Sequence, residues 1–317
     1  MTFLHSESKK NYIQKTSNIQ LPIFNQPWWL DVVCEDQQWD VFHMKCKDYE
    51  IFLPFYYKSK IFFKISTLPI FTPKINPIII GKKNLELNEN EFNKIINFIS
   101  KKFSYYNQSW EGINFNFKEQ NIKYKFYLKN IKSYIINNIH ITKNFLEKFS
   151  VDTKRLIRKA KFNNLVLDLN CDPDLFYSTH VSHLLKKGRS IFYKKDILIK
   201  IYKECVRNKS GKFFLVKDKH ENIHSGAFVV WDAKRAYLLC FTSNIDYSNL
   251  GGSSLLIQEV LAYLSDKTQN FDFEGGDGAR IGKFYSNFTK ETVCLRNISY
   301  FNNKIVDFLV RMKLSFF

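Results

Sequence analysis

A glycine-rich turn is the part of the sequence whose residue types best suit chemistry. The turn reads SNLGGSS, and Gly251, Gly252 and Ser253 lead directly into an amphipathic segment. Glycines let backbone N–H groups turn outward, and the first turn of a helix carries a partial positive charge, so the two together can cradle a phosphate. The alternative is that the glycines only reverse the chain. The pattern marks 251–253 as a candidate site for a phosphorylated cofactor.

A second candidate is a set of basic residues at helical spacing. Arg155 and Arg158 share one face of a predicted helix with Lys159. A guanidinium group matches two phosphate oxygens at once, so such a face can hold a diphosphate or a tRNA backbone. The alternative is an ordinary solvated helix face. We take Arg155 and Arg158 as candidate substrate-binding residues.

A third candidate lies in the segment FDFEGGDGARIGKFYSNF. Glu274 ends a predicted strand and precedes two glycines, so its side chain is expected to face a crevice, although a surface carboxylate in a turn is the alternative. Such a carboxylate can bind an acceptor or act as general base for an attacking amine. Arg280 and Lys283 follow on a predicted short helix and are candidates for phosphate binding.

Composition limits the classes of protein. The chain has 317 residues, 45% of them hydrophobic and 17% aromatic, and a net charge of +18. This length favours two globular domains. The charge fits an anionic partner such as nucleic acid, a phosphorylated cofactor or a membrane surface. It also fits a sequence saturated with Lys, Asn, Ile, Phe and Tyr for reasons of coding bias, so the charge alone does not choose.

Several classes are excluded by what the sequence lacks. No apolar run approaches the ~20 residues of a membrane span, and the polar start is not a signal peptide. The six cysteines are scattered, which predicts free thiols in the cytoplasm and no metal site. There is no P-loop, no dinucleotide-binding glycine pattern and no nucleophile elbow, so NTPase, dehydrogenase and serine hydrolase are excluded.

The elements that must position these candidates can be predicted from periodicity and turn residues. Residues 1–20 read as a loose polar tail. Most other segments show strand or helix patterns. We predict strands at 39–45, 51–57, 61–65, 112–117, 133–139, 212–218, 224–231, 235–242, 271–275 and 292–300, and helices at 27–33, 90–103, 141–164, 172–187, 194–207, 255–264, 279–288 and 304–313.

The order of elements in the second half resembles that of a GNAT acyltransferase domain. Two helices precede three antiparallel strands, the glycine turn, and an alternation of helix and strand. In that superfamily the turn after the strands holds the cofactor pyrophosphate, which implies that Gly251, Gly252 and Ser253 bind acyl-CoA. Ser248 stands where the GNAT signature usually has a longer side chain.

Several segments together resemble the FemAB-like branch of this superfamily, in the form common in Bacteroidetes. They occur in the expected order along nearly the whole chain: FNQPWWLDVVC with WDV, LPIFTP, SYIINNI with TKRLIRKAKFNNL, and FDFEGGDGARIGKFYSNF. The resemblance implies an α/β protein of two GNAT-like domains, 1–142 and 143–317, with the final ~20 residues packing back on the first domain. We expect two separate mixed, largely antiparallel sheets of six or seven strands each, flanked by helices.

The resemblance also implies a function. FemAB proteins use aminoacyl-tRNA to add amino acids to peptidoglycan precursors, and many relatives lack an assigned substrate. We expect a cytoplasmic acyltransferase, at the inner face of the membrane, that uses acyl-CoA and no metal. The expected acceptor is an amine or hydroxyl of a phosphorylated or lipid-linked sugar. The alternatives are transfer from tRNA and a degenerate fold that only binds an anionic glycan, membrane or RNA. The oligomeric state is left open.

One position departs from the family pattern. FemAB proteins with aminoacyl-tRNA activity carry Lys in a Phe-Lys-x-x-Phe-Gly segment, whereas this chain reads Phe-Tyr-Ser-Asn-Phe-Thr from Phe284 to Thr289. Tyr285 therefore replaces the lysine. We take Tyr285 with Glu274 as the candidate catalytic pair, and the missing lysine counts against the peptidoglycan reaction.

Overall fold

The computed structural model describes residues 6–34, 38–60, 63–82, 86–112, 126–141, 144–276 and 278–302. The chain divides into two compact units. Unit 1 comprises residues 1–131 and 294–317, and unit 2 comprises residues 132–293. The predicted boundary at 142/143 lies eleven residues after the change of unit at 131/132, and the predicted helix at 304–313 and most of the predicted strand at 112–117 lie outside the described residues.

Unit 1 is built on a mixed sheet with the strand order β1-β2-β3-β5-β12, and β4 pairs with β2. The β3–β5 pair is parallel, and the other pairs are antiparallel. The strands are β1 (Trp39–Lys45), β2 (Glu50–Lys60), β3 (Phe63–Thr67), β4 (Ile78–Ile80), β5 (Tyr105–Glu111) and β12 (Thr292–Phe301). The helices are α1 (Glu7–Thr16), α2 (Pro27–Val33) and α3 (Glu89–Lys102).

Local sequence accounts for helix α3. The Asn88 side chain accepts from the N–H of Glu91, and the Glu91 side chain accepts from the N–H of Asn88, which is a capping box. Phe92, Ile95, Ile96 and Ile99 then recur at helical spacing and are all buried in the core of unit 1. The predicted helix at 90–103 is thereby confirmed.

Helix α1 corrects the prediction of a loose tail. Ser6 caps it by accepting from the N–H of Lys9. Tyr12 is fully buried, and its hydroxyl donates to the carbonyl of Asn25. The Lys9 ammonium lies 3.8 Å from the centre of the Trp39 ring. The helix escaped prediction because one tyrosine and the methylene stem of a lysine supply most of its buried surface.

Unit 2 is built on a sheet with the strand order β6-β11-β10-β9-β8-β7. The predicted three-stranded meander is confirmed, since β8–β9 and β9–β10 pair antiparallel. The strands are β6 (Phe126–Ile136), β7 (Val166–Asp168), β8 (Gly211–Lys217), β9 (Ile223–Trp231), β10 (Arg235–Ser243) and β11 (Asn270–Asp272). The helices are α4 (Val151–Phe162), α5 (Pro173–Leu185), α6 (Lys195–Arg207), α7 (Gly252–Leu264) and α8 (Ala279–Tyr285).

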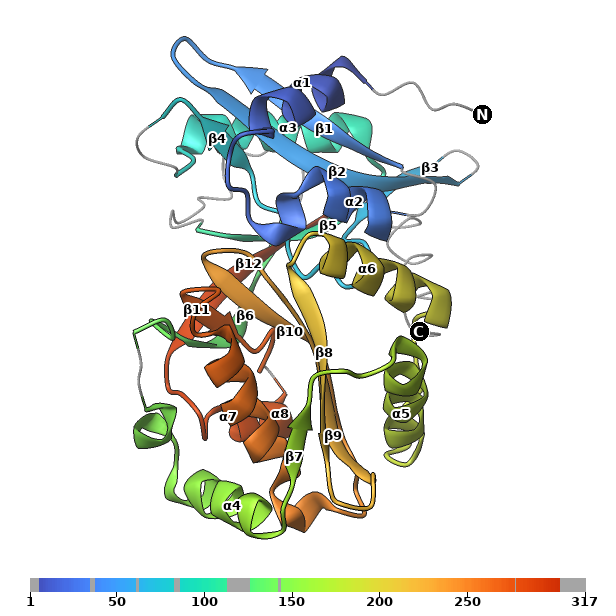
Figure 1. Cartoon of the computed structure of the whole chain (residues 1–317). Coiled ribbons are helices and arrows are strands. Elements are labelled where there is room, and N and C mark those ends of the chain that lie inside the picture. Colours follow the sequence, from blue (N-terminus) through green and yellow to red (C-terminus); the bar gives the residue numbers. More distant parts are fainter. Residues whose placement is uncertain are drawn as a thin grey trace. The chain divides into compact units, whose positions relative to one another are not determined.

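Helices cover both faces of the sheet of unit 2 (Figure 1). Helix α7 packs on β8 and β9 with α4 against it, whereas α5 and α6 pack on the opposite face. Neighbouring residues of β8 show the division. Phe213 stacks on Phe176 of α5 and Tyr202 of α6, and Phe214 packs on Tyr263 of α7. A strand with apolar side chains on both faces is expected in the interior of a sheet that is covered on both sides, and β8, β9 and β10 all lie between β7 and β11.

The expectation of two fully separate sheets needs one correction. Each unit has six or seven strands among the described residues, as expected, but β6 is shared: its residues up to Ile131 belong to unit 1, whereas Ile135 and Ile136 pair with β11 in unit 2. One strand therefore contributes to the sheets of both units.

Candidate active site at the end of strand β10

Strand β10 separates from β11 after only three paired residues. Arg235–Tyr237 lie parallel to Asn270–Asp272, and β10 then continues to Ser243 with β9 on its other edge. The register with β9 skips Leu239, which marks a β-bulge. Bulges re-aim the backbone and are frequent beside active sites. The second half of β10 thus has an edge that β11 does not cover.

A buried carboxylate directs the chain away from β10. Asp272 is fully buried at the end of β11, and it accepts from the hydroxyl of Ser133, the N–H of Glu274 at 3.0 Å and the guanidinium of Arg235 at 3.4 Å. Glu274 adopts φ +51°, an uncommon left-handed conformation for a residue with a side chain. Gly275 then donates to Ser133, so this turn is fixed to β6. Glu274 is half-buried at the turn, as a candidate acid–base group requires.

The structure gives the glycine turn a packing role. Gly251 has φ +81°, and a Cβ atom there would lie 2.0 Å from the carbonyl oxygen of Leu156 in α4. A Cβ on Gly252 would lie 2.7 Å from the Cβ of His224. Both glycines are therefore required by close neighbours, whether or not a ligand binds. The turn is the N-terminus of α7, as predicted, and Ser253 is half-exposed there.

A cluster of cations lies beside the end of β10. Lys187, at the end of α5, donates to the hydroxyl of Ser243 at 2.7 Å. Burial lowers the pKa of Lys187, and the positive charges of Arg189 and Arg280 lower it further. The structure therefore brings Arg280, a predicted site residue, together with Lys187 and Arg189, which the sequence analysis missed. The available signal was the run KKGRS at the end of a predicted helix. Three cations whose charges act on one another can together bind a phosphate group.

Buried polar side chains hold the segment that carries Lys187 and Arg189. The hydroxyl of Tyr193 lies 2.6 Å from Nδ1 of His180, and Nδ1 of His183 lies 3.2 Å from the hydroxyl of Thr242 in β10. Burial lowers the pKa of each histidine to about 4, so both rings are neutral at pH 7. Their hydrogen bonds fix α5 and the following loop to the β10 strand.

The two arginines of α4 lie on its exposed face. Arg155 is 3.7 Å from Asp152, and Nε of Arg158 donates to the carbonyl of Lys154. Between them, Leu156 contacts the glycine turn through its backbone. Their placement allows them to meet a large anion in solution, and it equally fits a solvated face.

Tyr285 and Lys283 lie on α8 in different surroundings. The Tyr285 ring is only 8% exposed and stacks on Phe273 at 4.5 Å. Burial, with the negative charges of Glu274 and Asp272, raises its pKa to about 12. The fold therefore brings the two candidate catalytic residues near each other and gives Tyr285 a place in the core. Lys283 is exposed.

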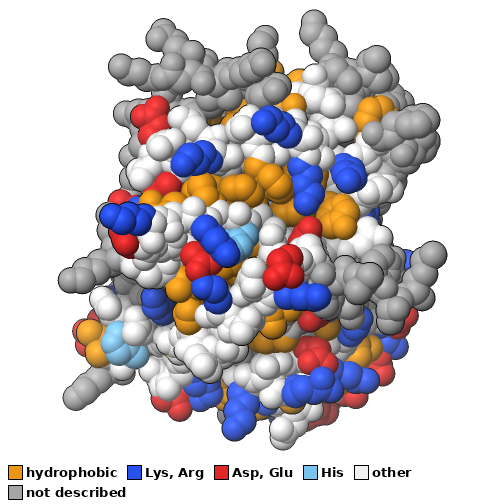
Figure 2. All heavy atoms as spheres, turned by 90° about the horizontal axis from the view of Figure 1, so that it is seen from above, with side chains coloured by type: hydrophobic (Ala, Val, Ile, Leu, Met, Phe, Trp, Pro, Cys, Tyr) orange, Lys and Arg blue, Asp and Glu red, His pale blue; other side chains and the backbone are white. Residues whose placement is uncertain are grey.

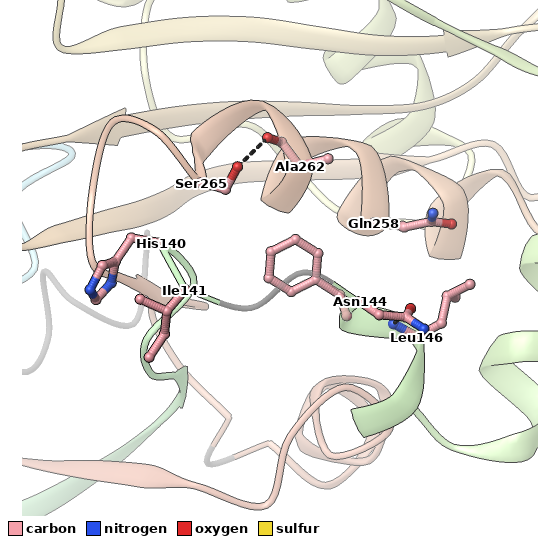
Figure 3. Close-up of a pocket in the computed structure, with 8 residues that line it drawn as sticks. His140, Ile141, Asn144, Leu146, Gln258, Ala262 and Ser265 are labelled. Atoms are coloured by element: carbon pink, nitrogen blue, oxygen red, sulfur yellow. Dashed lines mark hydrogen bonds between the residues drawn. The ribbon is translucent and has the colours of Figure 1, made fainter.

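A separate cavity lies on the other side of α7 (Figure 3). It has a volume of about 540 Å³, and the labelled side chains of His140, Asn144, Gln258 and Ser265 surround it. Oε1 of Gln258 is buried there and has no hydrogen-bond partner among the described residues. None of the predicted site residues lines this cavity.

On the face of the molecule shown in Figure 2, charged side chains are dispersed. Figure 2 shows Lys and Arg side chains scattered singly among hydrophobic, acidic and neutral ones on the face in view. Among the described residues, no group of His, Cys, Asp and Glu could hold a metal ion, and no helix is long and apolar enough to cross a membrane.

No family model and no curated protein matches the sequence. Solved structures do match the fold. A crystal structure of FemX has a TM-score of 0.63 at 12% identity, covering 98% of this chain and all of that one. The C-terminal DUF2156 domain of a lysylphosphatidylglycerol synthetase from Agrobacterium fabrum has a TM-score of 0.56 at 10% identity, covering 97% of each chain. A conserved protein of unknown function from Bacteroides thetaiotaomicron has a TM-score of 0.55 at 11% identity, covering 93% of this chain and 97% of that one. The chain therefore has a mixed α/β fold that it shares with these structures over nearly its whole length.

Proposed function

We propose that the protein is an acyltransferase that moves an acyl group from acyl-CoA to an amine or hydroxyl of a phosphorylated or lipid-linked cell-envelope sugar. The observation that carries the proposal is the geometry at the end of β10. There the bulged strand β10 extends beyond β11, helix α7 begins at the glycine turn, and Lys187 is affected by the charges of Arg189 and Arg280. The fold matches that of FemX over 98% of this chain.

The proposed reaction needs few protein groups. The acceptor amine loses its proton to Glu274 and attacks the thioester carbon. The carbon–sulfur bond then breaks, and CoA leaves as a thiolate that takes a proton from Glu274 or solvent. Backbone N–H groups on the uncovered edge of β10 polarise the carbonyl. Glu274 follows directly on β11, the strand that leaves the second half of β10 uncovered, and its N–H is held by Asp272.

The cation cluster suits the phosphate of the acceptor. Lys187 and Arg189 come from the turn and loop after α5, and Arg280 comes from α8, so the fold itself assembles them. The charges of Arg189 and Arg280 disfavour the charged form of Lys187, and a bound anion would offset this repulsion. A phosphate group on the sugar substrate would relieve that repulsion and hold the acceptor at the end of β10.

Transfer from aminoacyl-tRNA is the second candidate. Packing against Leu156 and His224 already accounts for the two glycines, so they do not require the pyrophosphate of CoA. The exposed arginines of α4 also favour this candidate, because they could contact a tRNA backbone. The FemX and lysylphosphatidylglycerol synthetase folds support the same candidate as much as the first. Tyr285 in place of lysine counts against it, because a buried phenol cannot hold a phosphate.

Donor-binding calorimetry tests the proposal. Acetyl-CoA is expected to bind, and charged tRNA is not; the reverse result would establish the second candidate, and binding of neither donor would leave a fold that only binds anions. Substitutions in the glycine turn are unsuitable because they disturb α4 and His224. Arg280→Ala is expected to weaken the binding of a sugar phosphate about tenfold. Lys203→Ala replaces an exposed lysine of α6 and should leave this affinity unchanged.

A further inference from the structure

The connector between α5 and α6, residues 185–195, exposes large apolar side chains. Leu185 is 63% exposed and Phe192 is 67% exposed. Single exposed apolar residues are ordinary, but two within eight residues give one short connector an unusual amount of apolar surface in water.

The fold holds Phe192 outward. Its neighbour Tyr193 is only 6% exposed, and the Tyr193 hydroxyl is bonded to His180 at 2.6 Å. At the start of the connector, the bond from Lys187 to Ser243 fixes the segment that follows α5. A partly buried bond near its start and a buried bond near its end thus hold the connector, so the exposure of Phe192 is a feature of the fold.

Basic residues are the sequence neighbours of both apolar side chains. The connector contains Lys186, Lys187, Arg189, Lys194 and Lys195, and no acidic residue. Two of these are neutralised from outside the connector, Lys186 by Asp246 and Lys195 by Asp174. Three positive charges therefore remain without a carboxylate contact among the described residues, and Arg280 adds a fourth nearby.

We propose that the connector 185–195 docks the protein onto an anionic lipid bilayer, with Leu185 and Phe192 entering the headgroup region. A negatively charged interface binds segments that combine exposed apolar side chains with Lys and Arg, because the apolar groups leave water while the cations meet lipid phosphates. A soluble anion would satisfy the charges and leave the apolar pair exposed. The inference does not depend on the proposed reaction.

Co-sedimentation with vesicles tests it. The protein is expected to bind vesicles of phosphatidylcholine with added phosphatidylglycerol, to ignore pure phosphatidylcholine, and to bind less at high salt. Phe192→Ser and Leu185→Ser should each lower the partition coefficient about tenfold. Arg189→Gln with Lys194→Gln should lower it by a similar factor. Unfolding curves must match the parent protein, which these surface positions allow.

Phe162 supplies the matched control. It is 86% exposed at the end of α4 and is also close in sequence to basic residues, so Phe162→Ser removes the same apolar surface elsewhere on unit 2. It should leave vesicle binding unchanged. The proposal is overturned if Phe162→Ser abolishes binding while Phe192→Ser does not, or if the parent protein ignores anionic vesicles. It is equally overturned if inorganic phosphate abolishes binding that Phe192→Ser leaves intact, because the cations would then be a soluble phosphate site.

Discussion

Replacing Gly251 with alanine is expected to destabilise unit 2 by more than backbone strain alone. Gly251 has φ +81°, and an L-residue in the left-handed region costs about 1 kcal/mol. The added Cβ would also lie 2.0 Å from the carbonyl oxygen of Leu156 and 2.7 Å from its carbonyl carbon. The helix α4 must then move away from α7 by about 1 Å. Overpacking of this kind costs about 1–3 kcal/mol. The sum is roughly 2–4 kcal/mol.

Gly188 provides the comparison. It has φ +65°, and nothing lies within 4 Å of the position of its Cβ, so Gly188→Ala carries the strain without the clash. For a unit of this size, a loss of 3 kcal/mol lowers Tm by roughly 6–12 °C, and a loss of 1 kcal/mol by about a third of that. Thermal unfolding followed by circular dichroism measures both. Equal Tm values for the two variants would refute the contact between Leu156 and the glycine turn.

Two further perturbations follow from buried polar groups. His180 and His183 have native pKa values of about 4, below the ordinary 6.5, so the unfolded chain binds more protons in acid. Their contribution to the free energy of unfolding should be fully present above pH 6.5 and fall by on the order of 3 kcal/mol per histidine, about 6 kcal/mol in total, as the pH drops toward 4. Urea midpoints at pH 7 and pH 4.5 measure this, and a pH-independent midpoint contradicts it. Asp272→Asn should lower the free energy of unfolding, measured in urea, by about 2–4 kcal/mol, because Ser133 and the other donors lose a buried carboxylate acceptor. Asp266→Asn, at an exposed aspartate, should lower it by less than about 0.5 kcal/mol. Similar losses for the two variants would show that the buried network contributes little to stability.

The second half of the chain could be predicted well because its signals are local. Asp172 caps α5 by accepting from the N–H groups of Asp174 and Leu175, and the polar turns of the meander follow apolar runs. Such signals depend only on neighbouring residues. The short β7 and the helix α1 were missed, since β7 pairs through three residues and α1 depends on burial of Tyr12 against distant rings.

The candidate site divides in the same way. The sequence by itself marked the glycine turn, Glu274 and Arg280, because glycines, a carboxylate before glycines and a basic helix face are visible in one dimension. Only the tertiary structure showed that Leu156 and His224 close on the glycines and that Lys187 joins Arg280. These pairs are far apart in the chain. Their contacts arise from packing of helices on a sheet, which depends on side-chain volume across the whole unit and leaves no periodic trace in the sequence.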